Sequence, residues 1–263
     1  FEPSASDPSK VRFYLDRVDL ADPEEPVSLP PVNIPGSLLA YDAESGRAVT
    51  VDYRTVRFDA ITASECYEKY GGRFETKNAR LDATTIGSCT TVQHVLALLA
   101  VSGNRATLVD GYALAPGEWV QTSLLGDDRL FLSLGSSSYY RGIGVGGAVD
   151  VAFGPGGYYF SGGATELLVL GGIRSDALST GRLELDTGNF WSGSSLLAVS
   201  GERAVVTTGF QGEVTLVDAT DPTEPRVVRE VGIAGGVHDV EIVNGTAVIA
   251  LGYDGVETIP IGD

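Results

Sequence analysis

Residues 18–51 and residues 217–250 carry the same pattern and align without a gap at an offset of 199. Each copy has a strand, an Asp-Pro turn, a second strand, a glycine, a third strand, a glycine turn and a fourth strand. Strand-and-turn units that recur along a chain are typical of radial or stacked β arrays, because one unit alone cannot bury its apolar face. The repeat therefore predicts an all-β array.

A shorter spacing of 43 residues recurs near the C-terminus, where three positions of one unit match three of the next: Ala204 and Ala247, Gly209 and Gly252, Gly212 and Gly255. Such a spacing is typical of one four-stranded propeller blade. The remaining segments read as short strands between Gly, Asn-Gly, Asp-Gly and Asp-Pro signals, without helical periodicity of useful length. We predict an all-β fold, a β-propeller with blades of four antiparallel strands.

The strand order bears on whether the ring closes. With strands lettered a to d from the axis outward, the chain begins with c and d, passes through three full blades and stops after a, b and c. These ends do not complement each other, so the order favours an incomplete ring that belongs to a larger propeller. A compact ring of four or five blades, with residues 256–263 as a tail, is the alternative. We treat residues 1–263 as a single propeller domain or portion of one, with insertions at about 56–93 and 136–163.

Composition limits the partners. The chain is acidic, with a formal net charge of -17, which opposes binding to nucleic acid or to an anionic membrane. No stretch of 18 apolar residues is present, so we expect no membrane-spanning segment.

The two cysteines, Cys66 and Cys89, are separated by 22 polar and turn-rich residues. Neither belongs to a Cys-x-x-Cys pair or to a zinc-ligand spacing. We predict a disulfide, with two free thiols as the alternative, and closing such a loop stabilises the fold by about 3 kcal/mol. A disulfide indicates an oxidising compartment, so we expect an extracytoplasmic location: secreted, periplasmic or at the cell surface.

Asp-Pro turns occur at equivalent places in the two repeats. Asp19 and Asp22-Pro23 in the first copy correspond to Asp218 and Asp221-Pro222 in the second. Carboxylates at such positions accept hydrogen bonds from turn amides while proline presets φ. We interpret them as turn caps, with a cation site as the alternative.

A family resemblance rests on the second repeat. The segment VDATDPTEPRVV followed by GGVHDVEIVNGTAVIALGYDGVETIPI resembles the LVIVD repeat. The copy at residues 18–51 matches the turn and the glycine but has Leu38 and Leu39 where the family has His-Asp. The chain is also similar to the C-terminal portion of secreted or surface bacterial β-propeller proteins. The resemblance implies an extracytoplasmic scaffold and brings no catalytic residues.

The chain has two histidines, His94 and His238. His238 and Asp239 begin an inner strand, where side chains can point toward the axis. We interpret this pair as a structural tie between neighbouring strands, with a ligand or metal contact at the axis as the alternative. No G-x-S-x-G or H-E-x-x-H motif is present, so we name no catalytic residue and predict no metal site.

Loop aromatics are the other candidates for binding. Exposed aromatic side chains anchor recognition surfaces, because they bury a large area at small entropic cost. Packing within the insertions is the alternative role. The candidates in the two insertions are Tyr67, Tyr70, Tyr139, Tyr140, Tyr158 and Tyr159.

Two functions remain. The first is a non-catalytic extracytoplasmic propeller that acts as a protein-interaction or structural scaffold at the cell surface. Its partners would be other protein chains, such as a missing N-terminal part of the same propeller or a surface assembly. The alternative is a propeller hydrolase or Ca²⁺-binding enzyme using axial carboxylates. Among the inner strands only the one at His238 opens with two polar residues of catalytic type, which favours the scaffold without cofactors.

Overall fold

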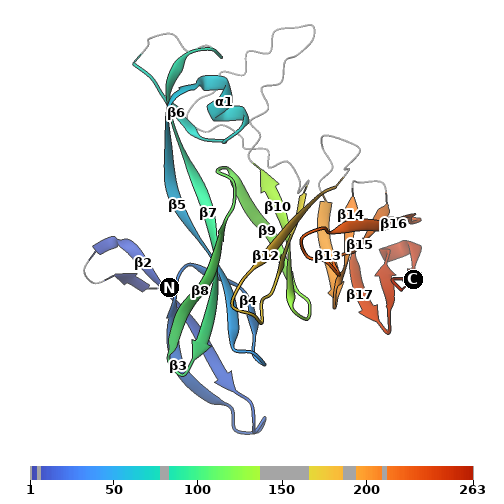
Figure 1. Ribbon diagram of the computed structural model, residues 1–263. Coiled ribbons are helices and arrows are strands. Elements are labelled where there is room, and N and C mark those ends of the chain that lie inside the picture. Colours follow the sequence, from blue (N-terminus) through green and yellow to red (C-terminus); the bar gives the residue numbers. More distant parts are fainter. Residues whose placement is uncertain are drawn as a thin grey trace, which may run out of the picture.

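A computed structural model of the protein describes residues 2–4, 7–77, 83–136, 166–185, 194–208 and 212–262. Within these residues the chain is built almost entirely of antiparallel sheets that follow one another along the sequence (Figure 1). This arrangement confirms the predicted all-β propeller fold.

Five sheets contain the described strands, and we name them in chain order. The N-terminal sheet holds β1 (Glu2–Ser4), β2 (Asp7–Asp19) and β3 (Val27–Ile34). Blade 1 holds β4 (Ser37–Asp42), β5 (Arg47–Thr62), β7 (Ile86–Ser102) and β8 (Arg105–Ala113), with the short β6 (Arg73–Glu75) added beside β7.

The remaining sheets repeat the same up-and-down order. Blade 2 holds β9 (Glu118–Leu125), β10 (Arg129–Ser136), β11 (Glu166–Gly171) and β12 (Ser179–Glu184). Blade 3 holds β13 (Ser194–Ser200), β14 (Arg203–Thr208), β15 (Glu213–Asp218) and β16 (Arg226–Gly232). The C-terminal sheet holds β17 (Asp239–Val243), β18 (Thr246–Ala250) and β19 (Val256–Pro260), with the 3₁₀ turn η1 (Gly252–Asp254) before β19.

The first strand of each blade lies innermost. β4 contacts β9, β9 contacts β13, and β13 contacts β17, so the inner strands follow one another around a common axis. The other strands of each blade pair outward in sequence order.

The core consists of apolar layers between neighbouring sheets. In β11, Leu168 and Leu170 pack toward blade 1, whereas Leu167 and Val169 pack toward blade 3. A strand buried on both faces reads as a continuous apolar run rather than as an alternating one, which explains the sequence ELLVLG. Similar layers join blade 3 to the C-terminal sheet and the N-terminal sheet to blade 1.

An arginine at the start of the second strand of each blade reaches the next sheet. Arg47 bonds Asp176 (Nη2 to Oδ1, 2.6 Å), and Arg129 donates from Nε to the Ala219 carbonyl and from Nη2 to the Thr220 carbonyl, both at 2.6 Å. Arg203 donates to the carbonyl of Ile261. These contacts join each blade to the segment that follows the third strand of the next sheet.

Blade 1 extends into an arm. Beyond the blade, residues 52–62 of β5 pair with residues 86–95 of β7 and carry the helix α1 (Ala63–Glu68) at their far end. The arm rises above the blades at the top of Figure 1. The six-residue α1 is a local element that the sequence analysis did not name.

The terminal sheets remain separate. Among the described residues, β2 and β3 do not pair with β17, β18 or β19. The N-terminal and C-terminal sheets lie at opposite ends of the row of sheets in Figure 1, so the described strands form an open arc.

Candidate functional site

The long connections gather on one face of the propeller. Because neighbouring strands run antiparallel, every connection from second to third strand leaves the same face, on which the first strands also begin. We call it the b–c face. It carries the arm, and Ser136 at the end of β10 and Glu166 at the start of β11 also lie on it.

The arm has an exposed stalk. At the usual strand rise, residues 52–62 span about 30 Å, well beyond the paired part of the blade. Tyr53 is 64% exposed and Val92 is 41% exposed. Tyr53 pairs with His94 and Thr55 pairs with Val92, so the side chains of Tyr53 and Val92 lie on the same face of the stalk.

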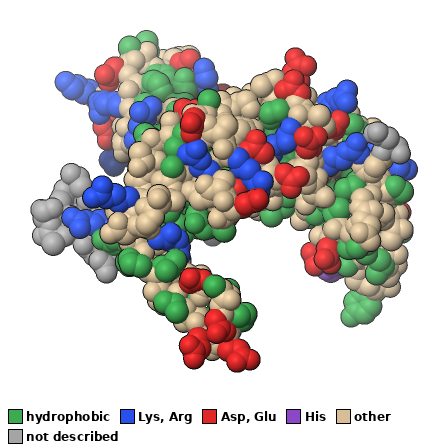
Figure 2. All heavy atoms as spheres, turned by 60° about the horizontal axis from the view of Figure 1, so that its bottom comes forward, with side chains coloured by type: hydrophobic (Ala, Val, Ile, Leu, Met, Phe, Trp, Pro, Cys, Tyr) green, Lys and Arg blue, Asp and Glu red, His purple; other side chains and the backbone are tan. Residues whose placement is uncertain are grey.

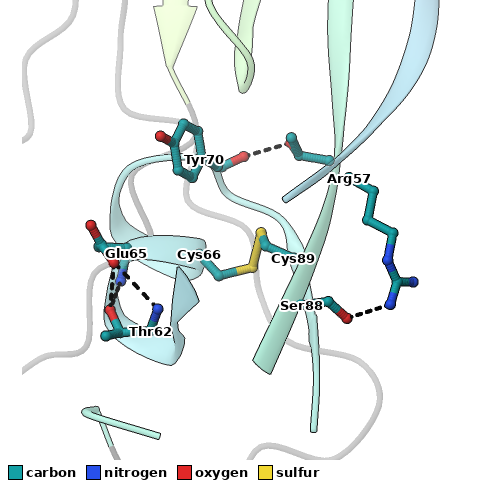
Figure 3. The surroundings of a disulfide bond; sticks show 8 residues. Arg57, Thr62, Glu65, Cys66, Tyr70, Ser88 and Cys89 are labelled. Carbon is teal, nitrogen blue, oxygen red and sulfur yellow. Dashed lines mark hydrogen bonds between the residues drawn. A yellow bond between two sulfur atoms is a disulfide. The ribbon is translucent and has the colours of Figure 1, made fainter. Parts of the chain in front are cut away.

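The tip of the arm is folded around a disulfide. The predicted Cys66–Cys89 bond is present and joins α1 to β7, as Figure 3 shows. The helix begins with a capping box, in which Thr62 accepts a hydrogen bond from the Glu65 amide and Glu65 accepts one from the Thr62 amide. The capping-box pattern of Thr62 followed three residues later by Glu65 thus explains why a helix starts within an arm built of strands.

Tyr67 and Tyr70 lie in this tip and are half-buried. The Tyr70 ring stacks on Phe58 at 4.5 Å between centroids, and Tyr67 contacts Phe74 at 6.2 Å. The Tyr70 carbonyl also accepts a hydrogen bond of 2.7 Å from the Thr91 hydroxyl. The structure therefore brings both tyrosines into the packing of the tip and leaves only part of each ring at the surface.

Backbone approaches the disulfide closely. A Cβ at Gly72 would lie 2.5 Å from Cys89 Sγ, and one at Gly87 would lie 2.3 Å from the Glu75 carbonyl oxygen. Side chains at these positions would displace the tip, so the two glycines fix its compact shape.

The other predicted aromatics, Tyr139, Tyr140, Tyr158 and Tyr159, lie outside the described residues.

A charged network lies in blade 2, beside Glu166 at the start of β11. Arg182 bonds Glu118 through both terminal nitrogens, at 3.0 and 2.9 Å, and bonds Glu166 at 2.8 Å. Its Nε donates to the Tyr112 hydroxyl at 3.2 Å, which links the network to blade 1.

These contacts shift two pKa values. Hydrogen bonds to Glu118 raise the pKa of Arg182 above its ordinary value despite burial. Burial raises the pKa of Glu166, and the attraction of Arg182 offsets this only in part. Two carboxylates that share one guanidinium are suited to joining strands rather than to proton transfer.

His238 immediately precedes β17, which begins at Asp239, and both residues are exposed. The His238 amide donates to the Ala250 carbonyl at 2.9 Å, whereas the Asp239 carboxylate accepts a hydrogen bond from the adjacent Val240 amide. The His238 backbone thus bonds the neighbouring strand β18. A Cβ at Gly252 would lie 2.7 Å from His238 Nε2, so the ring rests against that glycine.

His94 contacts the Glu118 carbonyl through Nδ1 at 2.8 Å, between blades 1 and 2.

The Asp-Pro turns lie on the opposite face, and the turn-cap interpretation is confirmed. Asp218 Oδ1 accepts from the Thr220 amide at 2.9 Å and from its hydroxyl at 2.7 Å, while Arg226 donates to Oδ2 at 3.0 Å. These bonds, led by the Thr220 hydroxyl, lower the pKa of Asp218 to about 2. In the first repeat, Asp19 accepts from the Ala21 amide at 2.9 Å.

In the described part of the chain, no group of three or more His, Cys, Asp or Glu side chains is arranged to hold a metal ion. Across the same residues, none of the helices has the length and apolar character needed to cross a membrane.

Comparisons with known proteins add little to this description. No family model matches the chain and no curated protein matches it, so the LVIVD resemblance is not confirmed. Similar solved structures are a protein from Lactobacillus plantarum (8% identity, 90% of this chain and 57% of that one, TM-score 0.45), BamB from Moraxella catarrhalis (12%, 68% and 55%, 0.28), and the designed protein Ika8 (9%, 88% and 73%, 0.29). The propeller assignment therefore rests on the sheets of this chain itself.

Sequence reasoning missed Tyr53 and the inter-blade arginines. The arginines had a visible signal, because Arg47, Arg129 and Arg203 each open an apolar strand after a short acidic or glycine turn. Tyr53 had none, because its exposure depends on β5 continuing beyond the blade.

Proposed function

We propose that the protein is a non-catalytic, extracytoplasmic β-propeller scaffold that binds another protein chain through the stalk of its arm. The observation that carries this proposal is the exposure of Tyr53 and Val92 on one face of that stalk. Large side chains held on a rigid ribbon bury much area at small entropic cost when a partner covers them.

The tip supports the same proposal. The Cys66–Cys89 disulfide, the capping box of α1 and the Phe58–Tyr70 stack give the tip a fixed shape. Preorganised elements lose little entropy on binding. The disulfide also favours an oxidising compartment, in keeping with a secreted or surface scaffold of LVIVD-like repeats.

A hydrolase or Ca²⁺-binding enzyme is the second function, and the b–c face does not favour it. Glu118 and Glu166 share Arg182, and Asp239 caps its own strand. These carboxylates serve the blades rather than a common reaction centre.

The test compares three forms of the full chain as immobilised bait for secreted and envelope proteins of the source organism. One is the wild type, one carries Tyr53→Ser with Val92→Ser, and the control carries Leu108→Ser. Leu108 is 65% exposed on the outer strand of the same blade. We expect the wild type and the control to retain the same protein, and the stalk variant to bind it about tenfold more weakly.

Equal retention by all three forms would exclude the stalk as the binding surface. Retention lost in the Leu108 control as well would indicate nonspecific adhesion.

A further inference from the structure

The two repeats allow one hairpin to be compared in two environments. By the offset of 199, Val18 and Leu20 of the N-terminal sheet correspond to Val217 and Ala219 of blade 3. In blade 3 both residues are fully buried, in the layer that packs against blade 2. The strand β15 that carries Val217 is paired on both sides, by β14 and by β16.

The turn of the blade 3 hairpin is covered as well. Arg129 of blade 2 donates to the carbonyls of Ala219 and Thr220. A Cβ at Gly171 of blade 2 would lie 2.4 Å from Pro222, and one at Gly181 would lie 2.5 Å from Pro225. Blade 2 therefore receives the turn with two glycines and an arginine.

The N-terminal hairpin has the equivalent positions without these neighbours. Val18 is 55% exposed and Leu20 is 63% exposed, and Pro23 in the turn is exposed too. From Tyr14 to Asp19, β2 pairs only with β3 among the described residues, so its other edge has no strand there in the described part of the chain. Exposed edges of this kind pair readily with an added strand.

Charge indicates what kind of chain would add that strand. The hairpin projects from the body, and its tip is acidic in Figure 2. The exposed carboxylates on it are Asp16, Asp19, Asp22, Glu24 and Glu25. In blade 3, Arg203 stands opposite Asp218, which corresponds to Asp19. A basic residue opposite Asp19 is thus the matching arrangement.

A second copy of this chain fits less well. At the position of the blade arginines, the C-terminal sheet has Thr246, and its inner strand carries the exposed acids Asp239 and Glu241. With a net charge of -17 on each copy, the acidic hairpin and this sheet would repel each other.

We propose that the N-terminal hairpin, residues 13–29, is a docking site for an extended strand of a different protein. The strand pairs antiparallel with the open edge of β2, places a basic residue opposite Asp19, and belongs to a sheet whose apolar side chains cover Val18 and Leu20. This site is separate from the arm and does not depend on the function proposed for it.

The test uses the full chain and a fluorescein-labelled synthetic peptide, GERAVVTT. The peptide has the sequence of residues 201–208, which include the strand paired with β15 in blade 3. We expect saturable binding by fluorescence polarisation. The same peptide with alternate amides N-methylated should not bind, because it cannot donate to the edge, and the peptide with Arg203→Glu should bind about tenfold more weakly.

Two protein variants locate the site. Val18→Asn with Leu20→Asn should weaken peptide binding about tenfold, because the strand loses its apolar cover. Val27→Asn with Leu29→Asn is the matched control and should bind as the wild type does. Val27 is 58% exposed and Leu29 36% exposed, and they lie on the opposite face, because Val18 pairs with Ser28 and Asp19 with Val27.

Several results would overturn the proposal. One is the absence of peptide binding to the wild type, and another is equal weakening of binding by both double variants. A third is a melting temperature that falls only in the Val18→Asn, Leu20→Asn variant, because this would show that the chain itself covers these two side chains. Sedimentation that finds a wild-type dimer abolished by Val18→Asn with Leu20→Asn would assign the face to a second copy instead.

Discussion

At the residue scale, the Arg129 side chain of blade 2 forms hydrogen bonds to blade 3. Its side chain is 13% exposed, donates to two carbonyls of the next blade and pairs with Glu202 at 2.9 Å. Removing it leaves the carbonyl of buried Ala219 without this donor, so Arg129→Ala should lower the free energy of unfolding by about 1–3 kcal/mol in urea titrations. Arg54→Ala is the control, because Arg54 is exposed on the arm and its guanidinium donates to the Gln93 side chain at 2.9 Å rather than to a neighbouring blade. A loss of under about 0.5 kcal/mol for Arg129→Ala, as expected of a surface substitution, would contradict this role.

The Asp218 carboxylate makes stability depend on pH. Hydrogen bonds from Thr220, then Arg226, lower its pKa in the folded protein to about 2, from 3.8 for the free side chain. A depressed pKa stabilises the fold above the unfolded value, and this contribution is lost as the pH falls from about 4 toward 2. It amounts to about 2 kcal/mol.

Replacing Asp218 by Asn should therefore destabilise the protein at pH 7 and make unfolding between pH 4 and pH 2 less steep. Chemical denaturation at several pH values measures both effects. Asp59→Asn is the control, because that side chain is 79% exposed and lies on the arm rather than between blades. Parallel pH profiles for the wild type and Asp218→Asn would exclude Asp218 as the source of the acid sensitivity.

The sequence predicts a side chain's hydrogen bonds where the bonded groups are close together along the chain. The carboxylates of Asp19 and Asp218 cap amides two positions away, so the turn motif alone predicts their role. The packing of Tyr70 on Phe58 was not predictable, because it depends on how the arm folds back on itself. Tyr53 was missed for a similar reason, since a strand residue is ordinarily covered by a neighbouring sheet.

At the scale of elements, the arm should respond to substitution separately from the blades. Gly72→Ala would place a methyl group 2.5 Å from Cys89 Sγ and 2.9 Å from the Thr90 carbonyl oxygen. We expect faster proteolysis between residues 63 and 88 and an unchanged melting temperature for the blades, because among the described residues the apolar cluster of the tip is separate from those of the blades. Gly236→Ala is the matched control, since nothing lies within 4 Å of its added Cβ. Unchanged proteolysis of Gly72→Ala would show that the tip adapts to the methyl group.

The turn signals in the sequence predicted the strands and their order, whereas they predicted the arm only in part. The cysteine spacing predicted the disulfide, but not that β5 and β7 would continue as paired strands on either side of it. α1 was missed because six residues are too short for helical periodicity to register. The Thr62–Glu65 capping box was the only local signal for it.

At the scale of the whole molecule, strand counting predicted the order of the sheets but could not place the terminal ones. The sequence shows that strands c and d come first, yet whether they meet β19 depends on the curvature accumulated over all the blades. In the structure they do not pair. The exposed face of the N-terminal hairpin is a consequence of that geometry, because its Val18, Asp19 and Asp22-Pro23 turn match those of the buried hairpin in blade 3.

The repeat of residues 18–51 does not coincide with a sheet. It contains the end of β2 and β3 from the N-terminal sheet, then β4 and the start of β5 from blade 1. Each copy therefore includes a covalent crossing from the outer edge of one sheet to the inner edge of the next. A gene duplication that copies this unit adds the connection between two sheets together with the apolar side chains that pack between them. A new sheet can therefore be added without first exposing an apolar face that nothing covers.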